Sequence, residues 1–459
     1  MSLPAPHEVV ERALAAADGP CVVLVDESHQ AEVRFANNTA TTNGRRRDRR
    51  VAVIRFCDVE GGIAAGVASR SGDVDVAAML EAAAADARSS PASPDAAPLV
   101  DRPPDDGFDT PPAEGDLGAF GPIVDALAPA FDSAANADRV LAGFVEQQVD
   151  TVYLGSSTGL RRRHSQPTTA VQMVARSRDG SRSAWVADAS ADLASVDIAA
   201  MDAHLAARLE WASRSVALPE GRYEVVLPPS AVADLMIDLV NYAGGQDAED
   251  GSSAFSAPGG GTRVGEQLCD LPFALYGDPA EPGLECAPFL AVGASSSESS
   301  VYDNGIDVGR TPWIEHGRLS NLRYHRAGAA RSATNFAPPV DNLVLDLPDA
   351  TGTTEELVAR TERGLLLTCL WYIREVDPAS LLLTGLTRDG VYLVERGEVV
   401  GAVNNFRFNE SPIDVLARTS EAGTSVRSLG REFGEWVNRS RTPPLRVIGF
   451  NMSSTSAAS

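Results

Sequence analysis

The sequence predicts an α+β protein with two domains, and three observations lead to this prediction. The chain has 459 residues, which is more than one compact hydrophobic core usually organises. Its first half mixes helical and strand patterns, whereas short strands and turns dominate from Val264 onward. We therefore expect a mixed N-terminal domain with an antiparallel sheet over residues 1–217 and a β-rich C-terminal domain over residues 218–459.

The first domain is expected to begin with a helix that leads into an antiparallel hairpin. Asn43-Gly44 predicts the hairpin turn, because both residue types tolerate the positive φ angles that tight turns require. An Ala-rich stretch with Met and Leu on one side then predicts a second helix. The expected elements are a helix over 8–17, strands over 21–25, 32–41, 50–56 and 63–67, and a helix over 73–88.

Residues 89–116 are expected to form a connecting loop, because this stretch is rich in Pro, Asp, Ala and Ser and lacks periodicity. A helix and a meander of strands follow it, and a capped amphipathic helix closes the domain. These elements are expected over 121–137 (helix), 140–149, 151–157, 165–177 and 183–189 (strands) and 197–213 (helix).

The second domain is expected to begin with a strand over 223–227 and a helix over 230–243. Ser230 can cap the first turn of this helix, and the pair Gly244-Gly245 can end it. An apolar face is predicted by five residues at helical spacing, Val232, Leu235, Met236, Leu239 and Val240. The remaining expected elements are a Gly/Ser-rich loop over 244–261 and helices over 354–362 and 413–419.

Charge and composition exclude several classes of function. The net charge is −24, from 39 basic and 63 acidic residues, so neither nucleic acid nor a membrane surface is an expected partner. Every basic residue is Arg, which excludes a lysine Schiff base, a phosphate-binding P-loop lysine and a Ser-Lys dyad. The first residues lack the basic and apolar segments of a secretory signal, so a cytoplasmic location is expected.

Other residues that carry chemistry form no strong motif. The five cysteines are scattered, which predicts free thiols, and Cys369 is expected in the core. The six histidines make no short metal pair. Two arginine runs, 45–50 and 161–163, are interpreted as solvated hairpin tips rather than nucleic-acid sites.

Two glycine-containing motifs are also weak. Residues 155–159 fit the Gly-x-Ser-x-Gly nucleophile pattern, but that chemistry needs a helix after the serine. A strand is expected to follow here, so a hairpin turn is the preferred interpretation. The cluster Gly259-Gly260-Gly261 precedes a strand rather than a helix N-terminus, so it is not expected to bind phosphate.

The helix over 230–243 carries the candidate site residues Asp234, Asp238, Asn241 and Tyr242. A zinc helix needs two imidazoles about one turn apart and a carboxylate beside the first. The corresponding positions hold Ile237, Asp238 and Tyr242, and Ile237 has no lone pair to offer, so no metal is expected in this chain. Asp234 and Asp238 are spaced for an acid/base or metal-binding pair. The preferred interpretation is that both residues lie on the solvent-exposed face of an amphipathic helix.

Several segments, in order along nearly the whole chain, resemble the TldD/PmbA family. The N-terminal ones are Val33-Arg-Phe-Ala, Val51-Ala-Val-Ile-Arg-Phe and Gly61-Gly-Ile-Ala-Ala-Gly, which are similar to that family's opening hairpin. The C-terminal ones are Tyr276-Gly-Asp-Pro279, Asp303-Asn-Gly-Ile306, Ile314-Glu-His-Gly-Arg-Leu319 and the hairpin from Thr387 to Gly397. Each motif alone is weak, and their order and spacing make the resemblance specific.

The resemblance implies which subunit type this chain would be. In the family, a TldD-type subunit carries His-Glu-x-x-x-His on the matching helix, and a late Cys completes its zinc site. Here those positions are Ile237, Asp238 and Tyr242, and no Cys follows Asn409. The pattern is similar to that of the metal-free TldE (PmbA) subunit, which pairs with a zinc-bearing TldD subunit around a peptide-accepting cavity.

The resemblance therefore implies a non-catalytic subunit of a heterodimeric metallopeptidase. It would serve proteolysis or the processing of natural-product precursors, with zinc held by the partner and a peptide as substrate. Asp238, Asn241 and Tyr242 are expected to face the substrate chamber. Two alternatives stay open: a metal-independent enzyme that acts as a homodimer, with Asp238 or Tyr242 as the acid/base group, and a peptide-binding or chaperone-like module.

Overall fold

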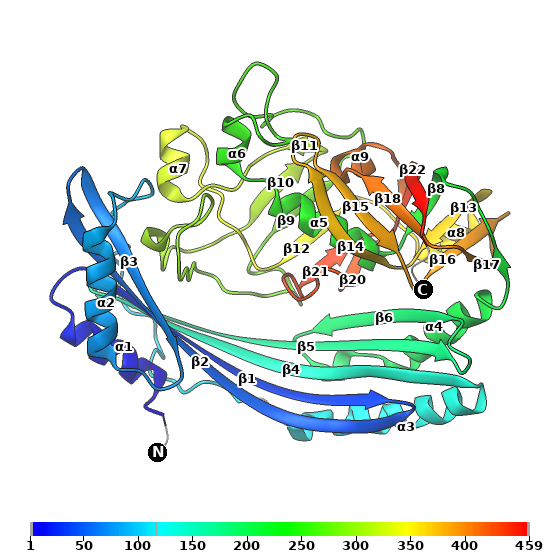
Figure 1. Cartoon of the computed structure of the whole chain (residues 1–459), viewed down its shortest axis with the longest axis horizontal. Helices are drawn as coiled ribbons and strands as arrows, with labels where there is room; N and C mark the ends of the chain where they lie inside the picture. Colours follow the sequence, from blue (N-terminus) through cyan, green and yellow to red (C-terminus); the bar gives the residue numbers. More distant parts are fainter. Residues whose placement is uncertain (1–2, 115–116, 457–459) are drawn as a thin grey trace.

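An antiparallel sheet of six strands forms the N-terminal half of the computed structural model, which describes residues 3–114 and 117–456. Its long strands run along one side of the β-rich remainder of the chain (Figure 1). The strand order is β3-β2-β1-β4-β5-β6. The strands are β1 (Cys21–Ala36), β2 (Thr39–Val59), β3 (Gly62–Ser71), β4 (Arg139–Ser156), β5 (Arg161–Ser177) and β6 (Ser183–Ser190).

Four helices pack on this sheet and confirm the expected helical segments. Asp75 and Asp197 cap two of them, since each side chain accepts a hydrogen bond from a backbone N–H in the first turn. α1 packs on β1 and β4, α2 on β2 and β3, α3 on β4, and α4 on β5 and β6. The helices are α1 (Pro6–Ala16), α2 (Val76–Ser89), α3 (Gly121–Asn136) and α4 (Ile198–Trp211), with short 3₁₀ turns at Leu117–Phe120 and Leu193–Ser195.

The predicted position of the first hairpin turn is wrong. The turn lies at Asn37 and Asn38, whose φ angles are 52° and 58°, the combination that a two-residue type I′ turn requires. Asn43 and Gly44 lie inside β2 instead, paired with Val33 and Glu32 of β1. Register decides between the two sites, because β1 continues without interruption to Ala36 and its partner must then start directly after the turn.

Neither arginine run is a solvated hairpin tip. Residues 45–50 lie within β2, where Arg49 is buried, and residues 161–163 begin β5, where Arg162 is buried. The turn between β4 and β5 spans residues 157–160. This confirms that the Gly-x-Ser-x-Gly pattern is a hairpin turn, and it also shows that the strands predicted over 140–149 and 151–157 are one strand, β4.

The predicted connector forms a loop from residue 90 to residue 114, and its last two residues, 115–116, lie outside the described residues. The five cysteines are free, and Cys369 is buried as expected. No helix among the described residues is long and apolar enough to cross a membrane.

The C-terminal half contains two further sheets. β7 pairs with β17 directly before the predicted boundary at residue 217, and the division into two domains stays a prediction. The larger sheet has the order β14-β15-β18-β22-β8-β13-β16-β17-β7, with β19 beside β22. Its strands are β7 (Ser215–Val216), β8 (Gly221–Leu227), β13 (Arg363–Leu367), β14 (Leu370–Asp377), β15 (Leu382–Thr387), β16 (Val391–Glu395), β17 (Glu398–Val403), β18 (Phe406–Glu410), β19 (Thr419–Ala422) and β22 (Leu445–Thr455).

The smaller C-terminal sheet has the order β11-β10-β9-β12-β21-β20. Its strands are β9 (Ala274–Gly277), β10 (Thr311–Glu315), β11 (Arg318–Leu319), β12 (Leu343–Asp346), β20 (Val426–Ser428) and β21 (Ser440–Thr442). The helices of this half are α5 (Pro229–Asn241), α6 (Gly245–Glu249), α7 (Arg326–Arg331), α8 (Thr354–Ala359) and α9 (Pro412–Ala417), with a 3₁₀ turn at Val301–Asp303. α6 and α7 lie where only loops and strands were expected.

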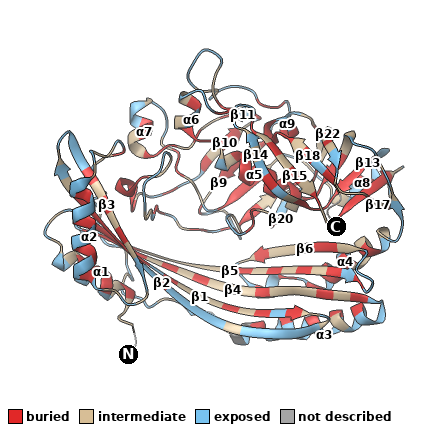
Figure 2. Cartoon of the chain, in the orientation of Figure 1, coloured by how far each residue is buried: buried red, intermediate tan, exposed pale blue. Residues whose placement is uncertain are grey.

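α5 is the central element of the C-terminal core. It contacts β8 of the larger sheet, β20 and β21 of the smaller sheet, and α9. Every residue from Ala231 to Leu239 is buried (Figure 2). A helix covered on both faces needs apolar residues all round, so any polar residue on it requires a specific partner.

Candidate functional site

The ends of α5 differ from the predicted ones. Ser230 lies inside the first turn and makes no capping hydrogen bond, and the N-cap is Pro228. The helix ends at Asn241, and Gly245 begins α6 rather than ending α5. Tertiary pairing ends the helix, because the Ala243 carbonyl accepts from the Arg323 N–H and the Gly245 N–H donates to the Arg323 carbonyl, at 2.8 and 3.0 Å.

Asp234 is fully buried and does not lie on a wet helix face as was expected. Its carboxylate accepts three backbone N–H donors from the loop after β20, those of Arg431, Glu432 and Phe433, at 2.9–3.0 Å. Burial raises the pKa of Asp234 to about 7, and the three donors act in the opposite direction. Asp234 therefore attaches the C-terminal loop to α5 and is not free to act on a substrate.

Asp238, one turn later, has a different environment. It is 4% exposed, and its Oδ2 has no hydrogen-bond partner among the described residues. Burial raises the pKa of Asp238 to about 7, Glu375 and Glu432 add to this shift, and Arg374 opposes it. A buried carboxyl with a raised pKa can exchange a proton near neutral pH, which is the property of a general acid or base.

Three charged residues around Asp238 were not predicted as site residues. Glu375 and Arg374 come from β14, and Glu432 comes from the loop that Asp234 holds. The Glu432 carboxylate accepts from Arg374 at 2.7 Å and from the Tyr372 backbone N–H at 2.9 Å. No signal in the sequence connects these residues with Asp238, because only the tertiary fold brings them together.

The remaining predicted site residues lie at the C-terminal end of α5. Tyr242 is half-buried, and burial together with Asp238 and Glu375 raises the pKa of its phenol. Asn241 is exposed, and its carbonyl accepts a hydrogen bond from Arg323 at 2.9 Å. The structure therefore brings Asp238 and Tyr242 together with Glu375, whereas Asn241 contacts Arg323.

The residues at the three positions of the zinc motif do not fit a zinc ion. Ile237 is buried and apolar, which leaves Asp238 and Tyr242 as the oxygen donors of the set. Within the described residues, no group of three or more His, Cys, Asp and Glu side chains is arranged to hold a metal. Zinc in proteins is held by three or four such donors, so the chemistry of α5 is that of a carboxyl and a phenol.

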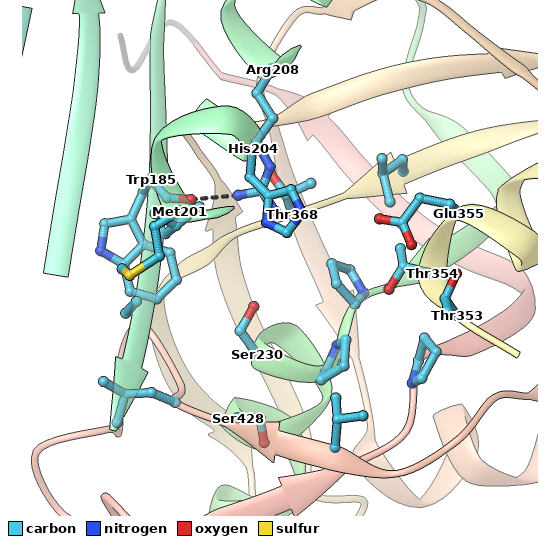
Figure 3. A pocket seen from close by; sticks show the side chains of 18 of the residues that line it. Trp185, Met201, His204, Arg208, Ser230, Thr353, Thr354, Glu355, Thr368 and Ser428 are labelled. Atoms are coloured by element: carbon cyan, nitrogen blue, oxygen red, sulfur yellow. Dashed lines mark hydrogen bonds between the residues drawn. The ribbon is translucent and has the colours of Figure 1, made fainter. Parts of the chain in front are cut away.

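A cavity of about 400 Å³ lies at the opposite end of α5. Trp185 of β6, His204 and Arg208 of α4, and Ser230 of α5 are among the residues that line it (Figure 3). The Arg208 guanidinium donates to the Trp185 carbonyl oxygen, so this donor is already bound within the protein. Because Asp238, Asn241 and Tyr242 do not line this cavity, it is separate from the predicted site.

The raised pKa of Asp238 predicts a pH-dependent effect of Asp238→Asn. The folded protein binds this proton more tightly than the unfolded chain, in which an aspartate has a pKa of about 3.9. The stability that Asp238 contributes is therefore present below about pH 4 and lost as the pH rises towards about 7. We expect Asp238→Asn to increase the free energy of unfolding by about 1–2 kcal/mol at pH 8 and by less at pH 5.

Urea unfolding at the two pH values measures this effect. Asp414→Asn, an exposed aspartate of α9, is the matched control and should change stability equally at both. An equal effect of Asp238→Asn at pH 5 and pH 8 would contradict the prediction.

The chain is similar to known proteins in part of its sequence and in its fold. Residues 220–454 match the family model described as the PmbA/TldA metallopeptidase C-terminal domain. The match covers more than half of the chain. The structure of TldE from Thermococcus kodakarensis is similar, with a TM-score of 0.75 and 16% identity over 97% of this chain and 98% of that one. A candidate modulator of a DNA gyrase from Thermotoga maritima has a TM-score of 0.74 and 15% identity over 97% and 99% of the two chains. At such identities these structures show the fold alone, and a comparison with curated proteins gave no match.

Proposed function

The chain belongs to the PmbA/TldD family, and on this premise we propose that it is a metal-free, TldE-like subunit of a peptidase. It would form part of a peptide-binding chamber beside a zinc-bearing, TldD-like partner. The observation that carries the proposal is the composition of α5 and its C-cap, where Ile237, Asp238 and Tyr242 occupy the three positions of the zinc motif. Proteolysis or the processing of a peptide precursor would then take place on the partner's metal.

The surroundings of α5 suit a chamber wall. Asp238, Tyr242 and Glu375 lie together at the end of the helix. β14, which carries Glu375, is an edge strand that pairs only with β15 among the described strands. An edge strand offers unpaired backbone donors and acceptors to an extended peptide, and side chains beside it provide selectivity.

A cytoplasmic location is part of the proposal. It is supported by five free cysteines, four of which are buried. Buried reduced thiols are usual in proteins that fold in a reducing compartment.

The proposal predicts that the purified chain alone does not hydrolyse peptides, and that activity appears with a zinc-bearing TldD-like partner. In the reconstituted pair we expect Asp238→Ala with Tyr242→Phe to lower kcat/KM about tenfold, which corresponds to about 1.4 kcal/mol of lost substrate interactions. Asp414→Ala on α9 is the control and should leave kcat/KM unchanged. Wild-type turnover by the double variant would show that these residues do not face the substrate.

A second candidate function is a metal-independent enzyme that acts as a homodimer. It is favoured by one observation, namely that burial raises the pKa of Asp238 to about 7, in the range of a general acid or base. The same assays distinguish the two functions. Peptide turnover by the purified chain in the presence of a chelator, lost in Asp238→Asn, would support the homodimeric enzyme and contradict the metal-free subunit.

A further inference from the structure

A second cavity, of about 460 Å³, lies between the N-terminal sheet and the C-terminal half. Strands β1, β4 and β5 form one wall and contribute Asp26, Asp150 and His164. Loops of the C-terminal half form the opposite wall and contribute Asp341 and Trp436. The residues that line this cavity do not include Asp238, Asn241 or Tyr242, so the cavity is distinct from the site at the end of α5.

Three carboxylates on the two walls, those of Asp26, Asp150 and Asp341, form no ion pair within the described residues. The side chains of Asp26 and Asp341 are accessible from solvent, and their carboxylates make no hydrogen bond or ion pair with another residue in the described part of the chain. Burial nevertheless raises the pKa of both side chains, because the surrounding protein partly excludes water from the cavity. The third carboxylate, Asp150, accepts from the Gln148 side-chain amide at 2.8 and 2.9 Å.

Two arginines oppose the three carboxylates, since Arg50 lowers the pKa of Asp26 and Arg439 lowers that of Asp341. Arg439 is 8% exposed, and its guanidinium donates to Thr168 Oγ1 at 2.6 Å and to the Asn438 side chain at 2.7 Å. Burial, together with the nearby Arg439 and Arg163, lowers the pKa of His164, which leaves this imidazole neutral at pH 7. The cavity therefore has an excess of negative charge.

The other lining residues are apolar and aromatic. Phe289, Leu290 and Val340 form an apolar surface within the cavity. Trp436 packs against Phe433 but is 67% exposed, so much of its indole is available to a ligand. A cation attracts both carboxylates and the face of a tryptophan, and an apolar chain attached to that cation would cover the aliphatic surface.

We propose that this cavity binds an alkylguanidinium or alkylammonium group, with Asp26 and Asp341 on opposite sides of the cation and Trp436 beside it. The group can come from an arginine or lysine side chain of a peptide or from a free amine, since the binding chemistry is the same. The site needs no partner subunit, so its test is independent of the proposed peptidase function.

Calorimetry on the full-length chain with a pair of isosteric probes tests the proposal. Butylguanidinium is expected to bind and butylurea, which has the same shape and no charge, is not. Asp26→Asn and Asp341→Asn should each weaken binding about tenfold, because each removes one charged acceptor, and Trp436→Ala should weaken it about threefold. Glu398→Gln, an exposed carboxylate on β17, is the charge-matched control and should change nothing.

A second arm identifies the source of the cation. A blocked Ala-Ala-Arg-Ala-Ala peptide is compared with the same peptide that carries citrulline in place of arginine. Tighter binding of the arginine peptide than of both the citrulline peptide and butylguanidinium supports a peptide ligand, and binding of butylguanidinium with no binding of either peptide supports a small free cation. Equal affinity for butylguanidinium and butylurea, or unchanged affinity in both aspartate variants, would overturn the proposal.

Discussion

Asp234→Ala is expected to lower the free energy of unfolding by about 3 kcal/mol, although Asp234 lies in the middle of the candidate site helix. The substitution removes the acceptor of the Arg431, Glu432 and Phe433 N–H groups. Each unsatisfied buried donor costs about 1–3 kcal/mol, and relief from burying a carboxylate offsets part of the sum. Urea unfolding at pH 7, followed by circular dichroism, measures the loss.

Two further variants separate the hydrogen bonds from the packing. Asp234→Asn keeps one oxygen for Glu432 and Phe433 but directs an amide NH₂ at the Arg431 N–H, so we expect about half of the loss. Gly430→Ala changes the loop instead of the helix. A Cβ at this position would lie 2.3 Å from Asp234 Oδ1 and would push against the carboxylate. If the free energy of unfolding of Asp234→Ala lies within about 0.5 kcal/mol of the wild-type value, other contacts hold the loop.

The second large effect is expected in the N-terminal sheet, where Glu27→Gln should destabilise the fold by about 3–5 kcal/mol. Glu27 is 1% exposed on β1, and its carboxylate accepts from both Arg47 and Arg49 of β2. Arg49 is itself buried, so removing the carboxylate leaves a guanidinium without its counterion in a low-dielectric environment. Thermal and urea unfolding of the full-length chain measure the loss.

A matched control lies on the same strand. Glu32 forms an ion pair with Arg34 at 3.0 Å, but the Arg34 side chain is 60% exposed. Glu32→Gln should therefore change stability by about 0–1 kcal/mol. Equal effects of the two substitutions would contradict the argument, since Glu27 is buried and binds two arginines, whereas Glu32 is partly exposed and pairs with Arg34.

Local residue patterns predicted the α+β class and most of the helices. Asp75 and Asp197 cap helices because their side chains reach a backbone N–H in the next turn, an interaction that needs no distant residue. The hairpin turn could not be placed in this way. Asn43-Gly44 is the stronger local signal, yet the turn forms at Asn37-Asn38, because pairing along the whole of β1 and β2 decides the register.

For the candidate site too, some properties follow from the sequence and others only from the fold. The poor fit of α5 to zinc was determined by the sequence alone, because Ile237 has no lone pair in any conformation. Only the tertiary structure decided what the carboxylates of α5 do. A spacing of four residues places Asp234 and Asp238 one turn apart, but a loop from the far end of the chain gives Asp234 three donors, whereas Asp238 faces Glu375 and Glu432. The identity of a side chain sets which bonds it can make, and the protonation and role of a buried carboxyl depend on neighbours that the fold brings to it.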